Sequence, residues 1–487
     1  MPTSRPRSRF TRGHLVTATV ALLLAACVAD PATMPVAPDL TPALARAGTG
    51  PTVTSTLPRS GEKGRTLDVR VYGTGFTAGA TATWALHGVA DPSKVKTNST
   101  TFVSSTELIA NITIAPDATI DYWDVQVSAA VCCKTGVGTE MFEVTTAMPV
   151  GPGSAYGVND LGDIAGTFGS IGSTAPHAYV VSGENASFSD LGLQHASAIS
   201  QDGRIVVGGI GSSQPIAAVW TRAAGAAWPI AGARLPDPPG MTFTNGRANG
   251  VVTLSGENVT IIAGILTTPS TAVYWESTDG TWGSPARLLP IPTGYVTTNN
   301  SALAMAANGD IAGQLNDPSG NSVAVVWRRV AGGYGVPDVL PRPSGYAVSR
   351  LFSISPDGTI LGGNVRVSSR GKDVLAPAFW TRDANGVYTV RLLPTLTGAN
   401  GGLDVAVFGV TVVGGQVRAV GTSPSPTNGT YLHAVSWTWT AGGSDFVVRD
   451  IGGVGTRSDV FPYAINAAGT IAVGGDGSGS IKWLLQP

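Results

Sequence analysis

The stretch Gly309-Asp310-Ile311-Ala312-Gly313, followed at a short distance by Val325-Val326-Trp327, decides the fold of this chain. The first part reads as a tight turn that leads into an apolar strand, and the second part as another apolar strand that ends in Trp. The turn-and-strand pattern recurs with marker glycines at positions 162, 203, 256, 309, 358, 415 and 469. Because successive markers lie 41 to 57 residues apart, we expect seven copies of one structural unit.

Each unit contains two further strands. A strand of small residues precedes the marker glycine, and a strand such as Arg287-Leu288-Leu289-Pro290 or Arg391-Leu392-Leu393-Pro394 follows the Trp strand. Four strands in a repeat of about 50 residues are typical of a β-propeller blade. Six of the eleven Trp residues end a third strand, where we expect them to pack between blades; they are Trp220, Trp275, Trp327, Trp380, Trp437 and Trp483. A Trp ladder that stacks on sugars is the less favoured alternative.

The last unit ends directly after its Trp strand, so its fourth strand must come from elsewhere. Residues 147–151, which precede the first unit, match the fourth-strand type. We therefore predict that residues 147–150 pair with residues 481–485 and close the propeller, because an open edge would invite aggregation. An open sandwich or an elongated array of repeats is the alternative.

The recurring pattern A-x-x-[IV]-[NS]-x-x-G-x-[IV]-x-G, followed by H-A-[FY] or A-x-W, resembles the HAF extracellular repeat family. It is represented here by Tyr156-Gly157-Val158-Asn159, by His177-Ala178-Tyr179 and by Ala464-Ile465-Asn466. The resemblance covers residues 150–487 and implies a bacterial surface or secreted protein. It implies no defined activity.

Residues 51–146 show a different pattern, with short alternating strands separated by turns. Strands are expected at 67–72, 101–103, 108–114, 123–127 and 140–144, which suits a β-sandwich. The strand that ends in Gly73-Thr74-Gly75-Phe76 and the stretch Val103-Ser104-Ser105-Thr106-Glu107-Leu108 resemble the immunoglobulin-like IPT/TIG domain. That resemblance implies a spacer or interaction module without catalytic residues.

The N-terminus resembles a targeting signal. Residues 1–26 contain four Arg residues and then a short apolar run, as a signal peptide does. The run ends in Leu24-Ala25-Ala26-Cys27, which resembles a bacterial lipobox and implies diacylation of Cys27. We expect residues 27–50, which contain four Pro residues, to form an extended tether. An outer-membrane lipoprotein is the predicted localisation, and an ordinary secretory signal is the alternative.

The charge, the cysteine content and the motifs of the chain bear on nucleic-acid binding, redox chemistry and cofactor binding. Only 13% of residues are charged and the formal net charge is −1, so no nucleic-acid partner is expected. Cys132 and Cys133 are adjacent and could close a vicinal disulfide, stay reduced or pair with another molecule. We expect no cofactor and no metal, since no catalytic, phosphate-binding or metal-binding motif occurs in the predicted mature chain.

One set of loops suggests a binding face. Three loops that join a fourth strand to the next unit share P-x-P-x-G followed by a large residue, which is Met241, Tyr295 or Tyr346, and Asn299 and Asn300 lie close by in sequence. The alternative is that these side chains only cap the blades. We predict a non-catalytic propeller that binds a glycan, a peptide or a protein, and the alternative is a propeller-type polysaccharide hydrolase or lyase whose charged groups converge from different blades.

Overall fold

The computed structural model describes residues 50–485, apart from 130–133, 170–175, 184–186, 212–213, 370–371, 397–403, 426–430, 441–442, 444–445, 454–458 and 478. All regular secondary structure within these described residues is β-strand, so the predicted all-β class is confirmed. Cys27, Cys132 and Cys133 lie outside the described residues.

Two β-sheets form a sandwich over the first part of the described chain. One sheet has the order β1 (Thr52–Leu57), β3 (Thr66–Thr74), β7 (Glu107–Ile114) and β6 (Val95–Ser104). The other has the order β2 (Ser60–Glu62), β9 (Thr135–Thr145), β8 (Asp121–Ser128), β4 (Thr81–Leu86) and β5 (Val89–Ala90). Alternate residues face inward, so Val69, Val71 and Ile112 join Trp84 and Trp123 in one apolar core. Each of the five strands expected here falls on an observed strand.

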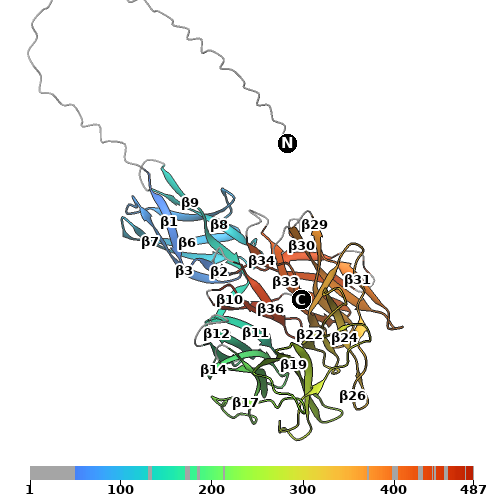
Figure 1. Cartoon of the computed structure of the whole chain (residues 1–487). Helices are drawn as coiled ribbons and strands as arrows, with labels where there is room; N and C mark the ends of the chain where they lie inside the picture. The colour runs from blue at the N-terminus through green and yellow to red at the C-terminus, as the bar shows by residue number, and fades with distance from the viewer. Residues whose placement is uncertain are drawn as a thin grey trace, which may run out of the picture. The chain divides into compact units, whose positions relative to one another are not determined.

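The remaining strands form antiparallel four-stranded units of the kind found in β-propellers (Figure 1). Their bounds are β11 (Ser154–Val158), β12 (Ile164–Phe168), β13 (His177–Val181), β14 (Phe188–Ile199), β15 (Ile205–Ile210), β16 (Ile216–Thr221), β17 (Ala233–Arg234), β18 (Asn245–Leu254), β19 (Val259–Thr267), β20 (Thr271–Ser277), β21 (Arg287–Leu288), β22 (Val296–Met305), β23 (Ile311–Asn316), β24 (Ser322–Trp327), β27 (Asp338–Val339), β28 (Val348–Ile354), β29 (Ile360–Ser369), β30 (Lys372–Arg382), β31 (Tyr388–Leu392), β32 (Val407–Val413), β33 (Gln416–Pro424), β34 (Leu432–Thr440) and β35 (Val447–Asp450). A small hairpin of β25 (Arg329–Val330) and β26 (Gly333–Tyr334) lies between β24 and β27 in the chain.

The first strands of these units form a closed inner ring. We call them the inner strands: β11, the second half of β14, β18, β22, β28, β32 and β36 (Phe461–Ile465). Each contacts the next in chain order, and β36 contacts β11. β14 serves two units, because residues 188–193 pair with β13 and residues 194–199 pair with β15. No loop separates those two units, which explains why their marker glycines are only 41 residues apart.

The predicted closure is confirmed. β10 (Ala147–Gly151) pairs with β38 (Ser480–Leu484) and completes the sheet that also contains β37 (Ile471–Gly475) and β36. Ala147 lies opposite Trp483, and Pro149 lies opposite Ile481. In Figure 1 the teal β10 accordingly lies beside the red C-terminal strands. The strand that precedes the first unit thus completes the last one and leaves β38 with a partner on each side.

The Trp ladder lies in the core and links successive units. All six Trp residues that end a third strand are at most 1% exposed. The Trp327 indole N–H donates a hydrogen bond of 2.7 Å to the carbonyl of Pro290, at the end of the preceding unit. The same bond joins Trp275 to Pro236, Trp380 to Pro341, Trp437 to Pro394 and Trp483 to Gly452. The indole nitrogen of Trp220, by contrast, is buried without a hydrogen-bond partner.

Candidate functional site

Every inner strand carries a β-bulge at the same place. On β22, Ala302 pairs with Gly313 and Ala304 pairs with the next residue, Ala312, so Leu303 has no partner. The corresponding bulge residues of the other inner strands are Tyr156, Ser197, Asn249, Phe352, Phe408 and Tyr463. All of them are half-buried, whereas the residue before each is buried. A bulge re-aims a side chain out of the sheet, so these residues point away from the blade cores.

A glycine on the neighbouring second strand makes room for each bulge. A Cβ atom on Gly313 would lie 2.1 Å from the carbonyl oxygen of Ser301, which is closer than non-bonded atoms approach. Glycine lies in the same position opposite the other bulges, at 166, 208, 264, 363, 421 and 474, and there too a Cβ would lie within 2.4 Å of a backbone oxygen. The glycine of the repeat therefore permits the bulge that aims residues inward.

Four of the seven bulge residues are aromatic, and the other three are Ser197, Asn249 and Leu303. The four aromatic residues are contiguous, since the ring of Phe408 lies 5.1 Å from that of Phe352 and 5.8 Å from that of Tyr463, and Tyr463 lies 4.9 Å from Tyr156. Asn249, one of the other three, donates through Nδ2 to the carbonyl of Ala302 at 2.8 Å.

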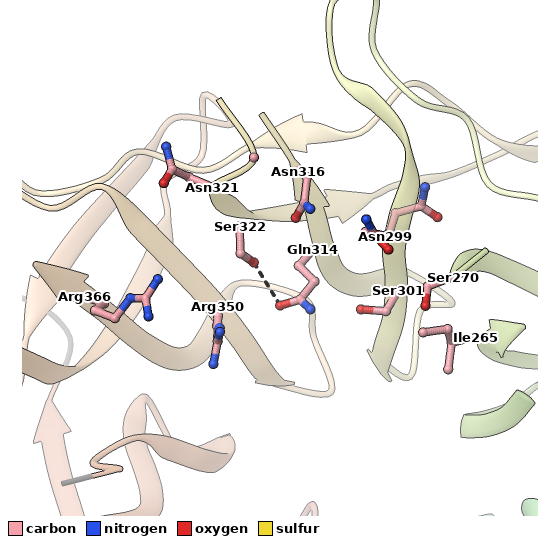
Figure 2. Close-up of a pocket in the computed structure, with 12 residues that line it drawn as sticks. Ile265, Ser270, Asn299, Ser301, Gln314, Asn316, Asn321, Ser322, Arg350 and Arg366 are labelled. Carbon is pink, nitrogen blue, oxygen red and sulfur yellow. Dashed lines mark hydrogen bonds between the residues drawn. The ribbon is translucent and has the colours of Figure 1, made fainter. Parts of the chain in front are cut away.

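A pocket of about 340 Å³ opens where β22, β23, β28 and β29 come together (Figure 2). Ten of its twelve lining residues are Ser, Asn, Gln or Arg, and the complete lining is Ile265, Ser270, Asn299, Asn300, Ser301, Gln314, Asn316, Gly320, Asn321, Ser322, Arg350 and Arg366. Pockets of this size hold small ligands. Polar groups therefore dominate what a ligand would meet.

An irregular segment of β22 builds one wall of the pocket. Val296 pairs with Asn316 and Ser301 pairs with Gln314, so residues 297–300 face a single residue of the partner strand. Asn299 takes the left-handed conformation at φ 60°, which Asn tolerates better than most residues, and its side chain is exposed. The segment leaves the ladder and turns polar groups toward the cavity.

Asn300 holds that segment in place. Its Oδ1 accepts a 2.5 Å hydrogen bond from the backbone N–H of Ala272, and its Nδ2 donates to the carbonyl of Thr297 at 3.0 Å. The residue is 1% exposed. Asn300 thus fixes the pocket wall, and the exposed side chain of Asn299 lines the cavity.

The structure separates the other residues of the predicted binding face from this pocket. Met241 is exposed, whereas Tyr295 and Tyr346 are half-buried and pack against the apolar cores of two different units. None of the three lines the pocket, and Asn299 and Asn300 both do. Whether any of the five contacts a ligand stays a prediction.

Sequence reasoning missed the two guanidinium groups of the site. Arg350 lies on β28 two residues before the bulge residue Phe352, and Arg366 lies on the paired strand β29. Ser301 and Gln314 were also missed. The position of Arg350 within its repeat could have indicated it. Ser301, Arg247 and His195 lie at the equivalent position of their own inner strands, two residues before a bulge.

The surroundings of the inner ring also change the pKa of His195. Its side chain is 6% exposed, its Nδ1 lies 3.0 Å from Thr167 Oγ1, and its Nε2 is buried without a partner. Burial, assisted by the positive charge of Arg247, lowers the pKa of His195 to about 4. The imidazole is therefore neutral at pH 7. Burial also raises the pKa of Tyr156, whose ring lies 6.0 Å from that of His195.

Within the described ranges, no three His, Cys, Asp or Glu side chains are grouped so that they could hold a metal ion. The described part of the chain also contains no helix with the length and hydropathy needed to span a membrane.

Comparisons with known proteins give similarity in structure only. No family model matches the chain, and no curated protein matches it. Among solved structures, Kuenenia stuttgartiensis hydrazine synthase is 9% identical, with 68% of this chain and 94% of that chain covered and a TM-score of 0.44. The β-propeller domain of the Trilobed protease from Pyrococcus furiosus is 8% identical, with coverages of 82% and 95% and a TM-score of 0.35. The Dos1 propeller is 7% identical, with coverages of 74% and 88% and a TM-score of 0.35. At such scores we draw no inference about function from these proteins.

Proposed function

We propose that the protein is a non-catalytic binding protein, in which a seven-bladed propeller presents the pocket between β22 and β29 to a glycan. The blade count rests on the sheets, which fall into seven four-stranded units when β14 is divided between two of them. The choice of a glycan as the ligand rests on one observation, which is that amide, hydroxyl and guanidinium groups line the pocket. Such groups exchange hydrogen bonds with sugar hydroxyls and would leave an apolar peptide side chain without partners.

The site is rigid in the way that a binding site requires. Its residues lie on β19, β22, β23, β24, β28 and β29 or directly before β20 and β24, and Asn300 ties the irregular segment of β22 to β20. Side chains held on paired strands lose little freedom when a ligand binds, which favours affinity.

The rest of the chain fits display at a cell surface. We infer that Cys27 carries acyl chains, that residues 28–50 act as a tether and that the sandwich is an immunoglobulin-like spacer of the IPT/TIG type. Several acyl chains on one cysteine would hold the protein at the outer membrane. Replacing Cys27 with Ala should remove acyl labelling and release the protein from the membrane fraction, and persistent labelling would contradict this anchor.

The glycan proposal is tested with the purified protein on an array of bacterial, algal and plant glycans. We expect binding to a polar saccharide, weakened at least tenfold by Asn321→Ala, which removes a side chain at the rim of the pocket. Asn385→Ala is the matched control, because Asn385 lies in a distant turn, between β30 and β31. An array without any bound glycan would contradict the proposal, and so would equal binding by the two variants.

A polysaccharide lyase or hydrolase is the second candidate. One observation favours it: His195, Arg247 and Arg350 occupy the equivalent position on three different inner strands. Against it, His195 Nε2 is buried, and Asp and Glu are missing from the lining of the pocket. New reducing ends or unsaturated products, formed by the wild type and lost in His195→Gln, would establish this candidate in place of the binding protein.

A further inference from the structure

The pocket lining contains two cationic side chains and no acidic one. Arg350 and Arg366 supply two guanidinium groups, and none of the other ten lining residues is Asp or Glu. The chain as a whole has a net charge of −1, so this positive charge is local. We propose that the pocket is specific for acidic saccharides and that it binds their carboxylate or sulfate group through Arg350 and Arg366. This inference rests on the proposed function and narrows it to one class of ligand.

The register of β28 and β29 places the two guanidinium groups together. Arg350 pairs with Asn364, and Arg366 pairs with Val348, so the two Arg residues are diagonal neighbours on the same face of the sheet. Diagonal neighbours are within reach of long side chains. Figure 2 shows both side chains at the same side of the cavity, across from Ser301 and Asn299. An anionic group placed between them would lie within reach of both guanidinium groups.

Arg350 is available for such a ligand. The side chain is exposed, and it forms no ion pair with any residue that the structure describes. A guanidinium group presents its N–H donors in a planar fork that fits the two oxygens of a carboxylate or sulfate. A neutral sugar could use the same donors but would not gain the charge-assisted hydrogen bonds.

The opposite wall adds further hydrogen-bond donors. Ser301 Oγ is buried without a partner, so its hydroxyl group is left for a ligand. Gln314 accepts a 3.1 Å hydrogen bond from Ser322 Oγ through its Oε1, as the dashed line in Figure 2 marks, which leaves its Nε2 as the donor. Donors gathered around a cavity favour ligands rich in acceptor oxygens, as acid groups are.

The experiment compares saccharides that differ only in charge. Binding of oligogalacturonate and of its neutral methyl ester to the purified protein is measured by calorimetry, and a sulfated galactan oligomer is compared with its desulfated form. We expect at least one acidic member to bind tenfold or more tightly than its neutral partner. We also expect Arg350→Gln to remove most of that difference, and Arg350→Lys to keep part of it.

Arg449→Gln is the matched control. Arg449 is exposed on the outer strand β35, and its replacement changes the net charge by the same amount without touching the pocket. Preference for the carboxylate pair or for the sulfate pair tells which acid group is the ligand. Equal binding of acidic and neutral members, with both lost in Asn321→Ala, would overturn this inference and leave the proposed function standing. Failure of every glycan on the array and in calorimetry would overturn both.

Discussion

The imidazole of His195 is buried in the inner ring beside Thr167 and is kept neutral by its surroundings. A buried histidine whose pKa is lowered stays neutral in the folded protein at a pH where the unfolded chain already binds a proton. A fall in pH therefore favours the unfolded chain. Its contribution to stability is therefore complete above the unfolded pKa of about 6.5 and is lost as the pH falls toward 4.

We predict that the free energy of unfolding falls by up to about 1.4 kcal/mol per pH unit between pH 6.5 and 4 because of His195. His195→Gln should remove this part of the slope, as measured by urea unfolding at a series of pH values. His433→Gln is the contrast: burial opposes the charge of His433, yet Asp450, 2.5 Å away, raises its pKa. The stability that the interaction of His433 with Asp450 contributes is present at low pH and is lost as the pH rises through the raised pKa of His433. An unaltered acid slope in His195→Gln would contradict the assignment.

Two Trp residues of the ladder allow the contribution of a single indole hydrogen bond to stability to be measured. Trp327→Phe removes the bond to Pro290, whereas Trp220→Phe removes an indole nitrogen that has no partner. Both variants lose similar ring volume from fully buried sites. We expect Trp327→Phe to lose about 1 kcal/mol more stability than Trp220→Phe, measured by denaturant unfolding. Equal losses would show that the indole bond contributes nothing.

At the scale of the element, the paired first and second strands of each unit depend on one glycine. Gly313 lies where a Cβ would meet the carbonyl of Ser301 at 2.1 Å, so any side chain must push β22 away from β23. The bulge at Leu303 and the pocket wall next to it depend on that close approach. The repeat motif thus specifies both a turn and the shape of the inner ring.

We predict that Gly313→Ala destabilises the protein by about 1 to 3 kcal/mol, as overpacking against backbone does, and that it weakens glycan binding. Gly256→Ala is the control, because a Cβ at Gly256 meets no atom within 4 Å; we expect a change within about 0.5 kcal/mol. Unfolding midpoints of the two variants give the comparison. A stability of Gly313→Ala equal to that of the control would refute the role of this glycine.

At the scale of the whole molecule, closure of the propeller depends on β10. Ala147 is 4% exposed and packs with Ile481 and Trp483 in one apolar core, while Met148 is half-buried. The sheet of β36, β37 and β38 would have an open edge without this strand. Burial of Ala147 and the ladder hydrogen bonds, at about 1 kcal/mol each, are then lost together.

Deletion of residues 147–150 should therefore lower the melting temperature and promote aggregation. Deletion of residues 36–39, within the predicted tether, removes the same number of residues and should change neither property. Calorimetry and size-exclusion chromatography measure the two outcomes. A monomeric 147–150 deletion with the melting temperature of the wild type would mean that β10 is dispensable for closure.

Much of the architecture could be predicted from the sequence, because it depends on features that recur. Gly309 takes a positive φ in its turn and Trp327 is buried, and equivalent residues recur along the chain. Their recurrence indicates a repeated unit of four strands. It also shows that the last unit lacks a strand, which β10 supplies. Asn299 and Asn300 were also identified, since they are polar neighbours of the P-x-P-x-G loop at residues 290–294.

Only the tertiary structure decided which residues share a site. Arg350, Arg366, Ser301 and Gln314 come from two neighbouring units, and they meet because adjacent blades place equivalent strands side by side around the ring. Alternation of apolar and polar residues does not reveal a bulge, which shifts one residue out of that alternation. Tyr295 and Tyr346 lie in similar loops, yet they turn toward blade cores because apolar surface is close to them there. The repeated sequence thus determines the ring, and packing between its units determines the pocket.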